Sequence, residues 1–172
     1  MTKLEIIHVP DPLLKTVSRA VEQVDDDLRK LMDNMLESMY AAPGIGLAAI
    51  QVAVPRRLLV IDTEGDASNP QPKFIINPEV VWESDDISVY NEGCLSVPDQ
   101  YAEIERPANI RLKYIDYFGK SQEEEMGGLL ATCVQHEIDH LDGVVFIDYL
   151  SRLKRNMIIK KIMKADKETQ AL

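Results

Sequence analysis

Two histidines stand four residues apart in the segment His136-Glu137-Ile138-Asp139-His140. The surrounding sequence predicts a helix that is introduced by Gly127-Gly128, runs to about Asp142 and stops at Gly143. Residues four apart lie one above the other on a helix face, so both imidazoles can reach a single metal ion. Glu137 lies about 100° around the same helix, where it could reach water at the metal. The motif therefore predicts a metal-binding helix with an acid/base carboxylate, and a solvated helix without metal is the alternative.

The third metal ligand must come from outside this motif. Zinc proteases of the common type take it from a downstream His or Glu, but the only other histidine of this chain is His8, far upstream. Cys133 lies on nearly the same helix face as His136 and His140, yet it stands a rise of about 10 Å from His140. Cys94 could present a thiolate from a strand and leave a fourth position open, as in catalytic sites. We therefore expect Cys94 as the ligand and Cys133 in the core or in a pocket wall, while a buried, non-ligating Cys94 or a carboxylate ligand is the alternative.

The length, the cysteine content and the charge limit the class of protein. The 172 residues are typical of one domain, and two cysteines provide no disulfide framework, which fits a reducing compartment. No N-terminal apolar run indicates a signal peptide, and no stretch approaches the roughly 20 apolar residues of a membrane span. The net charge of −10 argues against DNA as a partner of the whole chain. We expect residues 1–172 to form a single catalytic domain in the cytoplasm, with no contact to membrane.

The remaining sequence predicts helices at both ends of the chain and short strands between them. Apolar residues at 3–4 spacing predict an amphipathic helix from Asp25 to Tyr40, and a last helix runs from about Ser151 to Lys167. Short strands rich in β-branched residues are expected at Arg57–Thr63, Lys73–Ile76 and Val80–Trp82. An antiparallel meander is expected over Tyr101–Arg106, Asn109–Tyr117 and Ser121–Met126. The fold class is α+β, with short antiparallel strands around a central metal-binding helix.

A glycine-rich segment, Gly44-Ile45-Gly46-Leu47-Ala48-Ala49-Ile50-Gln51, precedes the first expected strand. Small residues allow another backbone to come close, so the segment suits a loop or a sheet edge that pairs with an extended peptide. A tight helix-to-strand connection explains it equally well. It lacks the Gly-Lys-Ser/Thr sequence of a phosphate loop.

Three short motifs occur in a fixed order: Gly-Ile-Gly-Leu-Ala-Ala-Ile-Gln, Glu-Gly-Cys-Leu-Ser and Gln-His-Glu-Ile-Asp-His. Together they closely resemble the three signature motifs of bacterial peptide deformylases, and the spacings and total length also match. The resemblance implies an enzyme that removes the N-formyl group from the initiator methionine of new polypeptides and releases formate. It implies that Cys94, His136 and His140 are the metal ligands and that Glu137 is the acid/base.

The same resemblance implies further roles in the site. The Gln51 side-chain amide and the Leu95 backbone N–H would face the oxyanion. Residues that line or shape the methionine pocket would be Ile45, Glu92, Leu129 and Cys133, and the Gly46 region would pair with the peptide backbone. The family generally works with Fe²⁺, while Zn²⁺ forms are stable but often poorer catalysts, and we expect Ni²⁺ or Co²⁺ to give active protein as well.

The chain departs from many bacterial members at the rim of this site. Those members have an acidic residue at the position of Pro43 and a basic residue at or near Tyr101. Two other classes of function compete with deformylation: a peptidase built on the same metal motif, and a metal-stabilised binding domain without catalysis. The Cys94 ligand and the lack of a downstream histidine argue against the first, and an intact Glu137 with a complete oxyanion set argues against the second.

The C-terminal segment differs in charge from the rest of the chain. Residues 151–172 carry seven Lys or Arg and two acidic residues, a net charge of +5, which leaves −15 for residues 1–150. Three apolar series recur at helical spacing, so we expect much of this helix to dock: Leu150 with Leu153 and Met157, Ile158 with Ile162, and Ile159 with Met163. The basic residues either form a solvated face that offsets the acidic body or meet ribosomal RNA, which the family resemblance implies for some bacterial members.

Overall fold

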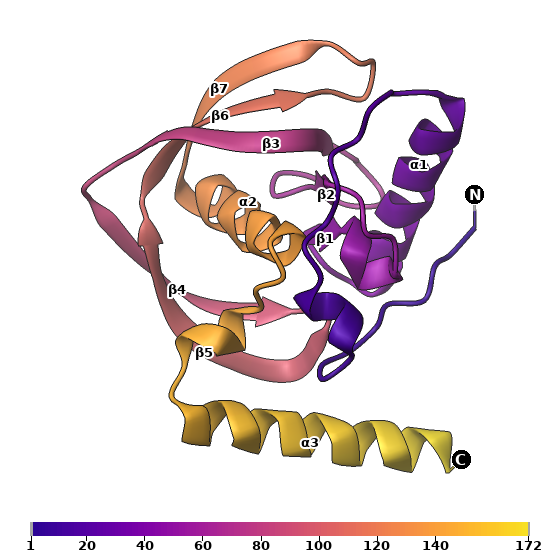
Figure 1. Cartoon of the computed structure of the whole chain (residues 1–172), viewed down its shortest axis with the longest axis vertical. Helices are drawn as coiled ribbons and strands as arrows, with labels where there is room; N and C mark the ends of the chain where they lie inside the picture. The colour runs from indigo at the N-terminus through magenta and orange to yellow at the C-terminus, as the bar shows by residue number, and fades with distance from the viewer. Residues whose placement is uncertain (1, 172) are drawn as a thin grey trace.

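Two antiparallel sheets enclose a central helix, α2 (Gly128–Leu141), in the computed structural model, which describes residues 2–171 (Figure 1). Met1 and Leu172 of the expected domain lie outside the described residues. The five-stranded sheet has the order β1 (Gly46–Ala48), β2 (Leu58–Ile61), β3 (Lys73–Glu83), β6 (Asn109–Ile115) and β7 (Ser121–Gly127). The second sheet pairs β4 (Ile87–Cys94) with β5 (Val97–Pro107). The predicted α+β class, with antiparallel strands around the motif helix, is confirmed, although β3 and β5 are longer than expected, with 11 residues each.

Helix α2 is packed from several sides, which explains how its polar residues come to lie inside the molecule. Its apolar residues Ala131, Val134 and Leu141 pack against β-strand residues of the larger sheet in one core cluster. The helix ends at Leu141, just before Gly143, the predicted stop, which has a φ of +78°. A Cβ there would lie 2.5 Å from the Lys15 carbonyl oxygen, so only glycine allows this close approach.

Helix α1 (Asp26–Ala41) forms where its apolar stripe predicts. Asp25 caps it by accepting a hydrogen bond from the Leu28 N–H at 2.9 Å, and the chain leaves the helix before Pro43. The buried residues Leu28, Met32 and Met35 pack against β1 and β2. This packing holds the glycine-rich segment, which follows α1, at the end of the five-stranded sheet.

The strands from β3 to β6 differ from the prediction. Lys73–Ile76 and Val80–Trp82 belong to one strand, β3, whose register shifts between Ile76 and Glu79. Asn77 occupies the left-handed region at φ 51°, and its side chain bonds to both backbone groups of Val21 at 2.8 Å. The expected break between two strands is therefore a bulge that a side-chain contact stabilises.

The expected three-stranded meander is only partly correct. β6 and β7 form the predicted hairpin, but β5 pairs with β4, the strand that carries Cys94, for which the sequence predicted neither bounds nor a partner. Pro107 has no N–H to continue the ladder, and the chain bends there from one sheet to the other. Hydrogen bonds from Ala108 to Asp86 and from Ser84 to Asn109, at 2.8 and 2.9 Å, hold this corner. The β4–β5 ribbon is thus free to fold over the opposite side of α2 (Figure 1).

Helix α3 (Arg152–Gln170) lies along the outside of β5 (Figure 1). Ile162 is its one buried residue, and Ile158 and Ile159 are partly buried against the same core cluster. Leu150 is also partly buried there, but Leu153, Met157 and Met163 are 72%, 51% and 53% exposed, so the expectation that these three residues dock is wrong. Among residues 2–171, no helix combines the length and the apolar content that crossing a membrane requires.

Candidate active site

Cys94, His136 and His140 come together at the heart of the molecule. Cys94 is the last residue of β4, and the histidines project from successive turns of α2. One potential ligand atom from each residue lies within 4.8 Å of the others, and Cys94 Sγ is 3.2 Å from His140 Nε2. Burial, together with the nearby charge of His136, holds the pKa of His140 well below its usual value. Cysteine sulfur and imidazole nitrogen are ligands of divalent transition metals, so the Cys94, His136 and His140 group fits such an ion.

Cys133 is placed differently, although it lies on the same helix. Its sulfur does not belong to the group of three ligand atoms but faces a cavity beside it. Burial and the neighbouring carboxylate of Glu137 raise the pKa of the Cys133 thiol to about 12. A thiol of that pKa remains protonated at neutral pH and is a poor metal ligand.

Glu92 and Arg106 fix the orientation of His136 from the Nδ1 side of its ring. Glu92 Oε1 lies 2.9 Å from His136 Nδ1, which leaves Nε2 of the ring for a metal. The Arg106 guanidinium donates to both Glu92 oxygens at 2.7 and 3.0 Å. Burial alone would raise the pKa of Glu92, but hydrogen bonds to His136 and Arg106 lower it, so the carboxylate stays ionised. Glu92 therefore contributes to the cavity wall and orients His136.

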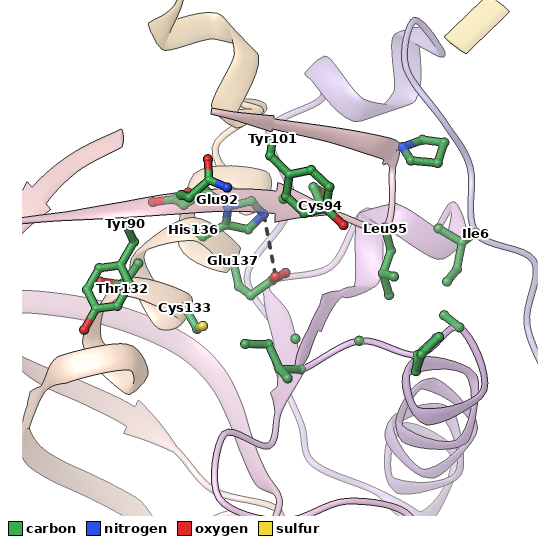
Figure 2. A pocket seen from close by; sticks show the side chains of 18 of the residues that line it. Ile6, Tyr90, Glu92, Cys94, Leu95, Tyr101, Thr132, Cys133, His136 and Glu137 are labelled. Atoms are coloured by element: carbon green, nitrogen blue, oxygen red, sulfur yellow. Dashed lines mark hydrogen bonds and ion pairs between the residues drawn. The ribbon is translucent and has the colours of Figure 1, made fainter. Parts of the chain in front are cut away.

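Glu137 lies beside the ligand group in a site shielded from water. Its Oε1 is 3.9 Å from His136 Nε2, the contact drawn as a dashed line in Figure 2. Burial raises the pKa of Glu137 to about 7. A Cβ at Gly46 would lie 2.9 Å from Glu137 Oε1, so β1 can approach this carboxylate only because residue 46 has no side chain.

Gln51 and Leu95 both lie next to Cys94, Gln51 through space and Leu95 as the next residue of the chain. The Gln51 side-chain oxygen accepts a hydrogen bond from Ala48 N–H at 2.9 Å, which fixes the orientation of the amide. Its nitrogen donates to Ser96 Oγ at 3.0 Å and lies 3.5 Å from Cys94 Sγ. Leu95 follows Cys94 directly and lines the cavity.

A cavity of about 700 Å³ opens next to the ligand group. Figure 2 shows Cys133 and Tyr90 on one side of it, Leu95 and Ile6 on the other, and Glu137 and His136 between them. The residues that the sequence assigned to the substrate all line it: Ile45, Gly46, Glu92, Leu129 and Cys133. The group of three potential metal ligands thus lies beside a largely apolar cavity, as in small-molecule and peptide sites.

A model of the polypeptide deformylase family matches residues 3–156. The chain belongs to the peptide deformylase family. The peptide deformylase of Phenylobacterium zucineum is 59% identical to it over 93% of this chain and 95% of its own length. The peptide deformylase of Rhizobium meliloti is also 59% identical, over 97% of this chain and 96% of its own length. The crystal structure of peptide deformylase from Ehrlichia chaffeensis superposes with a TM-score of 0.93 at 42% identity, covering 98% of this chain and 99% of that one.

Peptide deformylases are metallohydrolases that remove the N-formyl group from nascent chains, so this is the reaction of the chain. A second Ehrlichia chaffeensis deformylase structure, in complex with actinonin, has a TM-score of 0.90 at 46% identity over 96% of this chain and 98% of that one. The family resemblance in the three motifs is therefore confirmed by whole-chain similarity. The metal dependence of the family agrees with the Cys94, His136 and His140 group.

Arg106 is the member of this deformylase site that sequence reasoning missed. It is only 5% exposed, although arginine is usually a surface residue. Side chains two apart on a strand face the same side, and Ile104, two residues earlier, is buried. That alternation is the signal that could have placed Arg106 inside. At the rim, Tyr101 is 65% exposed and packs over Gly93, where a Cβ would lie 2.5 Å from the tyrosine ring.

Proposed function

We propose that Cys94, His136 and His140 bind one divalent ion in a single catalytic domain, with Fe²⁺ as the native metal, and that Glu137 moves the protons of deformylation. The observation that carries this proposal is the convergence of the three ligand atoms within 4.8 Å beside a buried carboxylate. When bound, such an ion supplies a Lewis acid that polarises a carbonyl and activates water. Zn²⁺, Ni²⁺ and Co²⁺ suit the same ligands.

The protein groups around this position divide the remaining work. Glu137 takes a proton from the attacking water and delivers it to the nitrogen of the leaving amine. The Leu95 backbone N–H and the Gln51 amide donate hydrogen bonds to the formyl oxygen as negative charge develops there. The products are formate and a free amino terminus.

The cavity supports methionine as the first residue of the substrate. Ile45, Leu129 and Cys133 provide an apolar wall that accepts an unbranched thioether. Gly46 is the first residue of β1, the terminal strand of the five-stranded sheet, so the peptide backbone can add to this edge as a further strand. We expect a much higher kcat/KM for formyl-Met peptides than for formyl-Asp or formyl-Lys peptides.

The direct experiment compares a formyl-Met peptide with its acetyl analogue, with metal analysis of the same sample. The expected result is formate release from the formyl peptide alone, by protein that holds one metal ion. Cleavage of an internal peptide bond would instead identify a peptidase, and a metal-loaded protein inactive on both peptides would identify a binding domain.

The identity of the metal has a separate test. Because a thiolate ligand and Fe²⁺ are both open to oxidation, peroxide should rapidly inactivate the iron form. The Ni²⁺ or Co²⁺ form should stay active in air. Equal activity and equal air stability of the Fe²⁺ and Zn²⁺ forms would contradict the assignment of iron.

We also propose that α3 contacts the ribosome in the cytoplasm through its outward basic side chains. Lys160, Lys161 and Lys164 are exposed, and the helix buries only Ile162, so its outer face is available. Ribosome co-sedimentation across a salt series tests this, because phosphate contacts weaken steeply as salt rises. A Lys160/Lys161/Lys164→Glu variant should lose binding with deformylation unchanged. A Lys30/Lys113/Lys120→Glu variant makes the same charge change at exposed positions outside α3 and should still bind.

A further inference from the structure

Glu92, which orients His136, is itself held by a chain of hydrogen bonds that reaches the surface of the protein. Besides its two bonds to Glu92, Arg106 donates Nη1 to Asp139 Oδ2 at 2.8 Å. The Tyr149 hydroxyl donates to the same Asp139 oxygen at 2.7 Å, and the Arg106 guanidinium lies 5.4 Å from the centre of the Tyr149 ring. The connection therefore runs from exposed Tyr149 to the candidate ligand His136 through residues that touch one another.

This series of hydrogen bonds joins secondary-structure elements that carry different metal ligands. Glu92 stands on β4 two residues before Cys94, and Asp139 stands on α2 directly before His140. Arg106, on β5, is the group that binds both carboxylates. A guanidinium offers its donors in a rigid, planar fork, so its two ion pairs fix the two carboxylates relative to each other. The fork thereby sets the position of the Cys94 strand against the helix that bears the histidines.

The chemistry of the residues is specific to this task. Arg106 is buried between two carboxylates, whose negative charges raise its pKa well above the usual range against the opposing effect of burial. Lysine would keep the positive charge, but a single ammonium cannot reproduce the planar fork. Tyr149, on the short helix η3 (Phe146–Tyr149), closes the open side of the Asp139 carboxylate and of the guanidinium.

We infer that Arg106 and Asp139 are positioning residues of the metal centre and that Tyr149 completes their arrangement from the surface. This inference rests on the proposed function, because it takes Cys94, His136 and His140 as the ligands. It adds that metal affinity depends on a hydrogen-bonded chain whose far end touches neither metal nor substrate.

The test measures Zn²⁺ affinity by competition with a chromophoric chelator, and the visible spectrum of the Co²⁺ protein. Substitution of residues that orient a metal ligand typically lowers metal affinity by roughly 10–100-fold. Arg106→Lys should fall within that range and shift the Co²⁺ absorption bands, Asp139→Asn should lose about tenfold, and Tyr149→Phe about threefold. In activity assays, kcat should fall while KM for the formyl peptide stays nearly constant.

Arg111→Lys is the matched control. Arg111 also pairs with a carboxylate, Glu125, at 3.4 Å and lies 5.9 Å from the centre of an aromatic ring, that of Trp82. These contacts are exposed and lie on β6, β7 and β3, away from the ligand group. The control should therefore keep wild-type Zn²⁺ affinity and the wild-type Co²⁺ spectrum.

Two outcomes would overturn the inference. The first is an Arg106→Lys protein with a lowered unfolding temperature but unchanged Zn²⁺ affinity and Co²⁺ spectrum, which would mean that Arg106 contributes only to stability. The second comes from the Tyr149→Phe and Asp139→Asn double mutant, which also decides the matter if Arg106→Lys does not fold. Loss of the Tyr149→Phe effect in the Asp139→Asn background supports the hydrogen-bonded connection, and full additivity of the two effects refutes it.

Cys94→Ala, measured alongside, separates this inference from the proposed function. Retention of metal by Cys94→Ala would overturn the ligand assignment itself. Loss of metal by Cys94→Ala, with Arg106→Lys at wild-type affinity, would overturn only the positioning role.

Discussion

Helices α2 and α3 follow each other in the sequence, yet they relate to the rest of the molecule in opposite ways. α2 has 14 residues, and both candidate histidine ligands and Glu137 are among its buried side chains. α3 has 19 residues, and Ile162 alone is buried. Each polar side chain of the site on α2 meets groups from β1, β4 or β5, whereas most charges of α3 face outward. Packing on several sides thus fixes the positions of the polar groups on α2. The polar side chains of α3, which packs along one side only, are not held in this way.

The largest effect should come from the metal ligands. Cys94→Ala should lose most of its metal and its activity, because two imidazoles alone hold the ion weakly. Cys133→Ser should retain metal, since its sulfur lies outside the ligand group. Metal analysis after gel filtration checks both variants. The opposite pattern, with metal lost only in Cys133→Ser, would show that the helix supplies all three ligands.

The next effect concerns Glu137, which is on α2 but is not a proposed ligand. Glu137→Gln keeps the shape and removes the proton-transfer group, so kcat should fall by about 10²–10⁴-fold. Metal content should stay near that of the wild type. Steady-state kinetics on a formyl-Met peptide, with metal analysis of the same preparation, gives the answer. A loss of metal in parallel with activity would make Glu137 a structural part of the centre.

Helix α3 should matter for stability through one residue. Ile162→Ala removes buried methyl groups and should lower the free energy of unfolding by about 2–4 kcal/mol. Deformylation at temperatures below the unfolding transition should be unchanged, since Ile162 lies in a cluster with Val97 and Ile104 and not in the cavity. Denaturant titration measures the first quantity. A drop in kcat/KM without loss of stability would mean that α3 is coupled to the chemistry.

The smallest effect is expected on the outer face of α3. Leu153→Ala should change the free energy of unfolding by no more than about 0.5 kcal/mol, because the side chain is already 72% exposed. The same denaturant titration compares it with Ile162→Ala. A loss as large as that of Ile162→Ala would show that Leu153 is covered in solution, and the contrast between the two helices would then fail.

Local sequence patterns predicted the elements whose signals are local. α1, α2 and α3 follow from helical spacing, caps and glycine stops, and β6 and β7 follow from a turn between two strands. The pairing of β5 with β4 could not be predicted in this way. It depends on a corner at Pro107 and on the shape of α2 beneath the ribbon, which are properties of the assembled fold.

The same division applies to the site. The spacing of His136, Glu137 and His140 is enough to predict their relative positions on a helix. The structure places Cys94 beside the two histidines. Arg106 has no neighbouring motif, and its role appears only when β4, β5 and α2 are brought together. On α3, three apolar series have equally regular helical spacing, but the rest of the protein covers only part of them. Periodicity cannot say which of them the rest of the protein will cover.

Strand β1 is three residues long and terminates its sheet, and its first residue, Gly46, lines the cavity. To pair with β1 as proposed, the first residues of a peptide need backbone N–H and C=O groups that have no other hydrogen-bond partner. Residues that already belong to a helix or a sheet have no such free groups. The proposed pairing therefore predicts that an N-terminus stops being a substrate once its first residues have folded.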